Sequence, residues 1–487
     1  MNDMKDKGVS RRSALKAMGV AGASSLFGVE TAAGEQKAIE YTDAKGSLSD
    51  VRKAIHKKVF QTPFVDTHEH LPEEKERLAG RGHPRLKSDD WTVLFSLGLS
   101  ADMEVAGMPR AVKDKFFSPG IDPLAKWKLL EPYWPFIKND GYGLTVRRTI
   151  KQLYDVDDLS NETIKKVQEG YQKVRRAGFY NYILRQLSNI ESCQVDSQEP
   201  PFVESEMPTL LMHDIDITAI VDTRDIASIS KPSGINVLSL SDWHKVIDWW
   251  FDKYGRYAVA VKSANAYKRD IDFERVDAEK VEGIFKKKLD GQALSETERK
   301  SLEDHIFWYA VDKATGQNLP VKVHTGYLSE VNTMSLGRVA KNPGSASELC
   351  RIQRDKGTRF VFFHICYPYY EPMIALAKQY SNAYIEMSFS WFINPVGAKD
   401  FLEKFLVCAP SSKVFTFGGD LRAVEMVLGH SILARQGIIL ALSELVEEGW
   451  MSLDDALNVI EPLMRGNAQR VFDLAQKYEA LNKVKWT

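Results

Sequence analysis

Short apolar runs rich in β-branched residues recur eight times along the chain, and most are followed by a polar loop and a long amphipathic segment. This alternation is typical of βα units, in which consecutive strands pair in parallel. Eight such units can close into a (β/α)8 TIM-type barrel, the α/β fold that we predict for this chain. The expected strands are residues 64–68, 189–195, 215–221, 257–262, 320–324, 359–364, 383–387 and 414–417.

Helix-capping signals support this pattern between the later strands. A serine opens each of three amphipathic segments, and a glycine ends or follows the last turn of each. In the second and third segments, a glutamate three residues after the serine forms a capping box. We therefore expect helices over residues 241–255, 295–316 and 345–357.

The interval between the first two predicted strands, residues 72–188, is too long for a βα connection. It is rich in Trp, Tyr, Lys and Arg, and segments such as residues 161–187 have helical periodicity. We interpret it as a helical insertion on the face where the active-site loops of a barrel lie. Its role as a lid, a substrate-specificity wall or an oligomer contact is left open, so a homo-oligomer is one of the alternatives.

The N-terminal segment resembles a twin-arginine signal peptide. Arg11 and Arg12 lie in a positive region, residues 17–29 form a weakly apolar stretch, and Ala32 and Ala33 offer small residues for cleavage. We therefore expect residues 1–33 to be a signal peptide and residues 34–487 to be the barrel domain. The resemblance implies export by the twin-arginine route to the periplasm or the extracellular space.

The charge balance and the hydropathy exclude two classes of partner. The chain has 65 Lys and Arg against 66 Asp and Glu, so it lacks the basic field that binds nucleic acid. No interior run approaches the roughly 18 to 20 apolar residues that span a bilayer. The four cysteines are widely spaced and include no C-x-x-C pair. We interpret them as buried small apolar residues, with a single disulfide left open.

The strongest local signal for chemistry is the run Asp66-Thr67-His68-Glu69-His70 at the end of the first predicted strand. Side chains two residues apart on a strand point to the same side, so the two imidazoles can reach one cation. The alternative is a pair of histidines in a polar loop.

Three further candidates, His324, His364 and Asp420, stand at the C-terminal ends of predicted strands. In a closed parallel barrel these ends converge on one face, where active sites are built. Together with His68 and His70 they offer neutral nitrogen and anionic oxygen ligands, which zinc, manganese and iron accept. The sequence therefore predicts a divalent metal centre, with zinc as the first choice.

With these motifs the chain resembles the amidohydrolase superfamily, and in particular its amidohydrolase-2 branch, which includes the amidohydrolase domain fused ahead of glutamine-synthetase-like domains. The resemblance covers residues 60–72 and 255–475 and does not extend to the insertion. It implies a barrel with metal ligands on its first, fifth, sixth and eighth strands. It rests on the stretches TPFVDTHEHL, VKSANAYKR, PVKVHTGY, FFHICYPYYEPMIALAKQYSNAYIEM and KVFTFGGD.

The resemblance also implies a role for Lys262, at the end of the fourth predicted strand. In superfamily members with two metals, a carboxylated lysine at this place bridges the ions. A solvated cation or a substrate contact is the alternative. A single metal would have His68, His70, His324 and Asp420 as ligands, and a second metal would add Lys262 and His364.

The mechanism that the resemblance implies is attack by metal-activated water on a C–N or C–O bond of a small amide, lactone or ester. Asp420 would orient the water and accept its proton, and His364 would polarise the carbonyl or protonate the substrate. The partner expected is therefore a small molecule. Candidates for binding a carboxylate on it are Arg224, Tyr267 and Arg422.

Two alternatives to hydrolysis stay open. A non-hydrolytic member of the same branch, such as a decarboxylase, a hydratase or a sugar-acid isomerase, would use the same scaffold. A catalytically inactive metal-binding or partner-binding protein would keep the ligands without turnover. The sequence carries no serine-hydrolase elbow, P-loop or dinucleotide-binding fingerprint.

Overall fold

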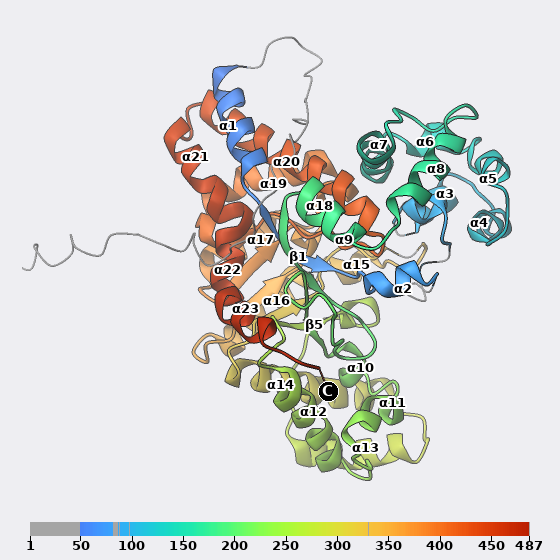
Figure 1. Cartoon of the computed structure of the whole chain (residues 1–487). Coiled ribbons are helices and arrows are strands. Elements are labelled where there is room, and N and C mark those ends of the chain that lie inside the picture. The colour runs from blue at the N-terminus through green and yellow to red at the C-terminus, as the bar shows by residue number, and fades with distance from the viewer. Residues whose placement is uncertain (1–48, 81–85, 87, 97, 330, 487) are drawn as a thin grey trace, which may run out of the picture. The chain divides into compact units, whose positions relative to one another are not determined.

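Parallel strands at the centre of the computed structural model are surrounded by helices (Figure 1). The structure describes residues 49–80, 86, 88–96, 98–329 and 331–486, all of which belong to one compact unit. The signal peptide predicted over residues 1–33 lies outside the described residues.

The described residues form nine strands, and every neighbouring pair is parallel. Hydrogen bonding links them in the orders β1-β2-β3 and β4-β5-β6-β7-β8-β9. Their bounds are β1 Phe64–Glu69, β2 Ile190–Val195, β3 Leu211–His213, β4 Ile215–Asp216, β5 Val261–Ser263, β6 Val321–Val323, β7 Phe360–Phe362, β8 Ala383–Glu386 and β9 Val414–Phe415.

Two junctions turn these strands into a closed barrel. Only Asp214 separates β3 from β4, and its N–H donates to the carbonyl of Val195 at the end of β2 over 2.9 Å, so β3 and β4 are halves of one strand. Between the last strand and the first, the N–H of Thr67 donates to the carbonyl of Phe417 over 3.1 Å. The strands therefore occupy eight positions of a ring, which confirms the predicted (β/α)8 barrel.

The third strand differs from its prediction of residues 215–221. It ends at Asp216, and residues Thr218–Val221 form helix α10. The carboxylate of Asp216 accepts the N–H of Thr218 over 2.6 Å, which turns the chain out of the strand. A short helix buried among apolar neighbours has no polar face, so its sequence reads like a buried strand.

Long helices cover the barrel between the strands, and the C-terminal helices pack on the strands in one shared apolar cluster. The helices outside the insertion are α1 Asp50–Gln61, α10, α11 Ile226–Ser230, η3 Lys231–Ser233, α12 Leu240–Tyr254, η4 Asn265–Tyr267, α13 Ala278–Leu289, α14 Glu296–Gly316, α15 Leu336–Val339, α16 Asn342–Gln353, η5 His364–Cys366, α17 Glu371–Gln379, α18 Ser390–Ile393, α19 Pro395–Cys408, η6 Ser411–Lys413, α20 Val424–Glu447, α21 Leu453–Glu461, η7 Pro462–Gly466, α22 Asn467–Val471 and α23 Leu474–Asn482.

The predicted helix starts are right in one case and shifted in two. The capping box at the start of α14 is confirmed, since the side chain of Ser295 and that of Glu298 each accept the other's backbone N–H. Helix α12 is capped by Ser239, two residues before the predicted start. Helix α16 starts at Asn342, because Pro343 suits the first helical turn, and the predicted cap Ser345 lies inside the helix.

The interval between β1 and β2 is helical, and α3, α4, α5, α6 and α8 gather in one group (Figure 1). Helix α7 of this interval packs against α20 of the barrel. A Cβ on Gly429 of α20 would overlap the backbone of Thr145, so this close crossing requires glycine. The elements are α2 Glu74–Leu78, η1 Trp91–Phe95, α3 Gly98–Val105, α4 Arg110–Phe117, α5 Pro123–Leu130, α6 Trp134–Ile137, α7 Gly141–Tyr154, α8 Ile164–Val174, α9 Phe179–Asn181 and η2 Tyr182–Leu187.

Helix α20 contradicts the expectation that no interior segment is long and apolar enough to span a membrane. Among the described residues it is the one helix that is long and apolar enough to cross a membrane, which the sequence prediction missed. In this fold 89% of its most apolar window is buried, and it packs against α1, α7 and α19. These contacts are those of a core helix.

The cysteines follow their prediction in three of four cases. Cys193, Cys350 and Cys366 are buried, whereas Cys408 at the end of α19 is exposed. All four have free thiols, so the disulfide left open by the sequence is not formed in this structure.

Candidate metal centre and active site

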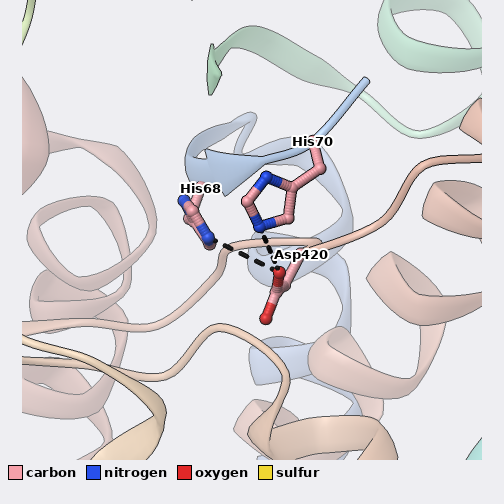
Figure 2. A group of neighbouring side chains, drawn as sticks. All are labelled: His68, His70 and Asp420. Atoms are coloured by element: carbon pink, nitrogen blue, oxygen red, sulfur yellow. Dashed lines mark ion pairs between the residues drawn. The ribbon is translucent and has the colours of Figure 1, made fainter. Parts of the chain in front are cut away.

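Figure 2 shows His68 and His70 turning their imidazoles toward the carboxylate of Asp420. The Nε2 atom of His70 lies 3.2 Å from Asp420 Oδ1, and that of His68 lies 3.5 Å from the same oxygen. One ligand atom from each residue lies within 4.8 Å of the other two. The spacing of two residues at the end of β1 thus brings both rings to one point.

The loop after β9 places Asp420 through two glycines and a left-handed residue. A Cβ on Gly418 would meet the Glu386 carboxylate, and one on Gly419 would overlap the Glu69 carboxylate. Asp420 itself has a φ of 54°, and its N–H donates to the carbonyl of His68 over 2.8 Å. Backbone conformations of this kind cost energy and cluster at functional sites.

His324 and His364 complete the group of five predicted side chains. His364 follows β7 with a φ of 60°. Its Nε2 atom lies 3.1 Å from Nδ1 of His324 and 3.8 Å from Oδ2 of Asp420. The strand ends of the barrel therefore gather four imidazoles and one carboxylate, although the residues are up to 352 positions apart in the numbering of the chain.

The contacts of His70 indicate which ring nitrogen carries a proton in the neutral ring. This assignment bears on whether the site suits a cation. The Nδ1 atom of His70 lies 2.8 Å from the backbone carbonyl of Asp196, which can only accept. A neutral ring therefore carries its proton on Nδ1 and presents a lone pair from Nε2 to the oxygen of Asp420. Two lone pairs at 3.2 Å repel each other, so this contact requires either a cation between them or a second proton that turns the ring into an imidazolium paired with Asp420. The donor set of two nitrogens and a carboxylate fits a divalent metal.

The same reasoning applies to the second pair of histidines. His364 Nδ1 faces the carbonyl of Ser388 at 3.0 Å, and His324 Nε2 faces the carbonyl of Tyr327 at 3.1 Å. Both outer nitrogens therefore carry protons, and two neutral rings have none left for the nitrogens that face each other. This pair offers a place for a second cation or an acceptor for a substrate proton.

The charges of the centre are those that metal ligands require. Burial and the charge of Lys262 hold the pKa of His68 well below its usual range, and burial lowers the pKa of His364 to about 4. Burial would raise the pKa of Asp420, but His68, His70 and His364 hold it well below its usual range. At neutral pH His68 and His364 are therefore neutral and Asp420 is anionic.

Lys262 lies close to this centre on β5. It is 1% exposed, and its Nζ atom lies 4.6 Å from the centre of the Phe363 ring. The face of an aromatic ring attracts an ammonium and repels an anion, so this contact suits a lysine that is not carboxylated. The bridging role of a carboxylated Lys262 stays a prediction.

The three predicted carboxylate-binding residues separate into two groups. The ring of Tyr267 lies 4.6 Å from that of His324, and Arg422 is buried, with a charge that acts on Tyr267. Arg224 has a side chain 41% exposed and pairs with Glu199 and Asp222. The prediction placed Arg224 at a strand end, but the third strand ends eight residues earlier, at Asp216.

Sequence reasoning missed a set of buried charges inside the barrel. The Nζ atom of Lys322 on β6 donates to Asp214 over 2.8 Å and to the carbonyl of Thr67 over 2.9 Å. Two further carboxylates, Glu386 and Glu69, brace the loop that carries Asp420, and the N–H of Leu421 donates to Glu69 over 2.8 Å. The available signal was a charged residue between two apolar residues at a buried strand, as in VKV and IEM.

Comparison with solved structures shows where this fold recurs. A uronate isomerase from Thermotoga maritima matches with a TM-score of 0.68 and 15% identity, over 87% of this chain and 98% of that chain. A glucuronate isomerase from Caulobacter crescentus matches with a TM-score of 0.66 and 15% identity, over 89% of this chain and 97% of that one. A protein from Lactobacillus casei ATCC 334, provisionally named a metal-dependent hydrolase, matches with a TM-score of 0.62 and 16% identity, over 87% and 98%.

At these identities the likeness shows a shared fold. Neither the family models nor the curated proteins compared with the chain gave a match.

Proposed function

We propose that the protein is a metal-dependent enzyme that acts on a small molecule, with hydrolysis of a C–N or C–O bond in an amide, lactone or ester as the first candidate reaction. The observation that carries this proposal is the gathering of His68, His70 and Asp420 in a buried centre, where one ligand atom from each residue lies within 4.8 Å of the other two. A divalent cation fits this set of two nitrogens and a carboxylate, and zinc is our first choice, with manganese or iron as alternatives.

His68, His70 and Asp420 would hold the metal, and His324 and His364 would either complete its ligands or hold a second ion. A bound divalent ion would polarise a carbonyl and lower the pKa of water from about 15.7 toward 7. Asp420 keeps its outer oxygen, Oδ2, within 3.8 Å of His364 and is the acceptor for the proton released on attack. His364 Nε2 is positioned to pass a proton to the leaving group.

A second candidate reaction is isomerisation of a sugar acid. Two of the matched structures are named as isomerases of uronate or glucuronate and share this fold over 87% and 89% of the chain. The buried Arg422 and the phenol of Tyr267 lie beside Asp420 and could bind a carboxylate. Isomerisation moves protons between neighbouring carbons, which the same carboxylate and imidazoles can support.

The test is turnover by the metal-loaded protein with a panel of lactones, amides, esters, dipeptides, unsaturated acids and uronates. Products separate the reactions, because hydrolysis consumes water, decarboxylation releases carbon dioxide and isomerisation forms a ketose. We expect Asp420→Asn to lower kcat at least 100-fold. Asp155→Asn is the matched control, since Asp155 is also left-handed, with a φ of 53°, but is exposed.

Two results would redirect the assignment. Undiminished activity in Asp420→Asn would refute the catalytic role of this carboxylate. A protein that binds metal but turns over no member of the panel would favour the third candidate, an inactive metal-binding or partner-binding protein.

We also propose that residues 1–33 direct export by the twin-arginine route to the periplasm or beyond. Replacing Arg11 and Arg12 together by lysine should retain the protein in the cytoplasm of a host with this pathway. Export that continues in the double variant would refute the route.

A further inference from the structure

The helical insertion places one tyrosine against the proposed active site. Helix α7 is capped by Asp140, whose carboxylate accepts the N–H of Gly143 over 2.7 Å. Tyr142 is the second residue of this helix and is 6% exposed. Its ring packs edge-on against Phe392 and Phe389, which follow β8, with centroid distances of 4.7 and 5.6 Å.

The ring of Phe389 packs against Tyr142 and also lies near a histidine of the proposed active site, His364. The ring of Phe389 lies 5.8 Å from that of His364 and 6.4 Å from that of Tyr327. Tyr327 is the residue whose carbonyl faces His324. Burial and the charges of Asp102, Tyr327, Asp420 and Tyr267 hold the pKa of Tyr142 well above its usual range. The phenol is therefore within electrostatic reach of Asp420.

The hydroxyl of Tyr142 is buried and has no hydrogen-bond partner within the described part of the chain. Leaving such a group unpaired costs free energy, and buried polar groups without a protein partner are the exception. The fold is nevertheless built around this position. A Cβ on Gly98 of α3 would overlap the phenol, so glycine at residue 98 is required for Tyr142 to lie there.

A second polar group lies one helical turn beyond Gly98. Asp102 on α3 is half-buried, and its carboxyl group lies within electrostatic reach of that of Asp140. Burial and the charge of Asp140 raise the pKa of Asp102 to about 7. Near neutral pH the carboxyl group of Asp102 can therefore donate or accept a hydrogen bond, and its charge also acts on Tyr142.

We propose that the insertion forms a specificity wall in which the buried hydroxyl of Tyr142 binds a hydroxyl group of the substrate. The substrate class is then a polyhydroxylated small molecule, such as a sugar acid or its lactone. This inference rests on the proposed function for the position of the substrate, and it assigns the insertion a role in binding. An apolar or unsubstituted acyl chain would leave the phenol unpaired and would bind more weakly.

The test compares two probes on the zinc-loaded, full-length protein by isothermal titration calorimetry. D-glucuronate carries hydroxyl groups on a six-carbon acid, and adipate has six carbons and carboxylates without any hydroxyl. The variant is Tyr142→Phe, which removes the oxygen and keeps the ring packing. The matched control is Tyr154→Phe on the same helix, where the hydroxyl is also buried without a hydrogen-bond partner but lies near Glu425 and Arg77.

We expect the wild-type protein to bind D-glucuronate more tightly than adipate, and Tyr142→Phe to raise the Kd for D-glucuronate about tenfold without changing that for adipate. Tyr154→Phe should leave both values within twofold. Equal binding of the two probes, absence of binding to both, or an unchanged Kd in Tyr142→Phe would overturn the inference. Zinc content and the effect of Asp420→Asn on turnover are measured in parallel, so a failure of the proposed function appears there and is distinguishable.

Discussion

The buried ion pair between Lys322 and Asp214 provides a test of the barrel interior that does not depend on any ligand. Both side chains are 0% exposed, and the Nζ atom of Lys322 lies 2.8 Å from Asp214 Oδ2 and 2.9 Å from the carbonyl of Thr67. Burial lowers the pKa of Lys322 and raises that of Asp214, and each partner opposes the shift of the other. Each charge of the pair therefore offsets part of the cost of removing the other from water.

Replacing Lys322 by methionine keeps most of the aliphatic stem and removes the charge. Asp214 is then left buried without its partner, and the carbonyl of Thr67 loses its donor. Losing one partner of a buried pair costs about 3 to 5 kcal/mol, whereas neutralising both costs much less. We therefore expect Lys322→Met to lower the free energy of unfolding by about 3 to 5 kcal/mol, and Asp214→Asn to recover part of this loss in the double variant.

Urea unfolding followed by far-ultraviolet circular dichroism at pH 7 measures these changes, with the four proteins of the double-mutant cycle compared under identical metal loading. Lys53→Met is the control, because Lys53 pairs with Asp50 at the surface, where both side chains are more than half exposed. It should leave the midpoint unchanged. A loss below about 1 kcal/mol in Lys322→Met, or strict additivity with Asp214→Asn, would refute the reasoning.

Two further expectations concern pH and glycine. Burial raises the pKa of Glu386 from 4.5 to about 7 in the folded chain, so the folded state binds more protons than the unfolded state between pH 4.5 and 7. The free energy of unfolding therefore falls as the pH rises through this range, on the order of 3 kcal/mol in total. Glu386→Gln should flatten this fall in urea titrations at pH 5, 6 and 7, and an unchanged slope would contradict the assignment. Gly419→Ala should destabilise the fold by about 1 to 3 kcal/mol, because its Cβ would overlap Glu69. Gly283→Ala, in open space on α13, should stabilise it by about 0.5 to 1 kcal/mol, and equal thermal shifts in the two variants would argue against the clash.

Most strands of the barrel were predictable because each is an apolar run that neighbours cover on both faces. The third strand is the exception. Residues 211–213 lie in LLMHD, and the mainly apolar sequence continues through β4 into α10, so periodicity cannot locate the boundary between strand and helix. The hydrogen bond from the N–H of Thr218 to Asp216 sets that boundary, and it depends on the three-dimensional path of the chain.

The gathering of His68, His70, His324, His364 and Asp420 was predictable from one geometric rule, the convergence of strand ends in a closed parallel barrel. The partners of the buried charges were not. Lys322 and Asp214 are 108 residues apart in sequence, and strand order decides that they meet.

The position of Tyr142 could not be predicted from the sequence either. It depends on the packing of α7 against α20, which lies far along the chain, and on the space that Gly98 leaves within the insertion. Long-range packing of an insertion leaves no periodic trace in its own sequence.

The most direct test of the central claim is the metal content of the purified full-length protein, measured by inductively coupled plasma mass spectrometry after dialysis. We expect at least one zinc, manganese or iron ion per chain, and loss of that ion in His70→Ala and in Asp420→Asn. His305→Ala should retain it, because His305 contacts His244 and the carbonyl of Val276. A stoichiometry near two metal ions per chain would support Lys262 as a bridge between them, and a stoichiometry near one would argue against that role. Undiminished metal content in both site variants, or no affinity of the wild-type protein for any of the three metals, would contradict the account.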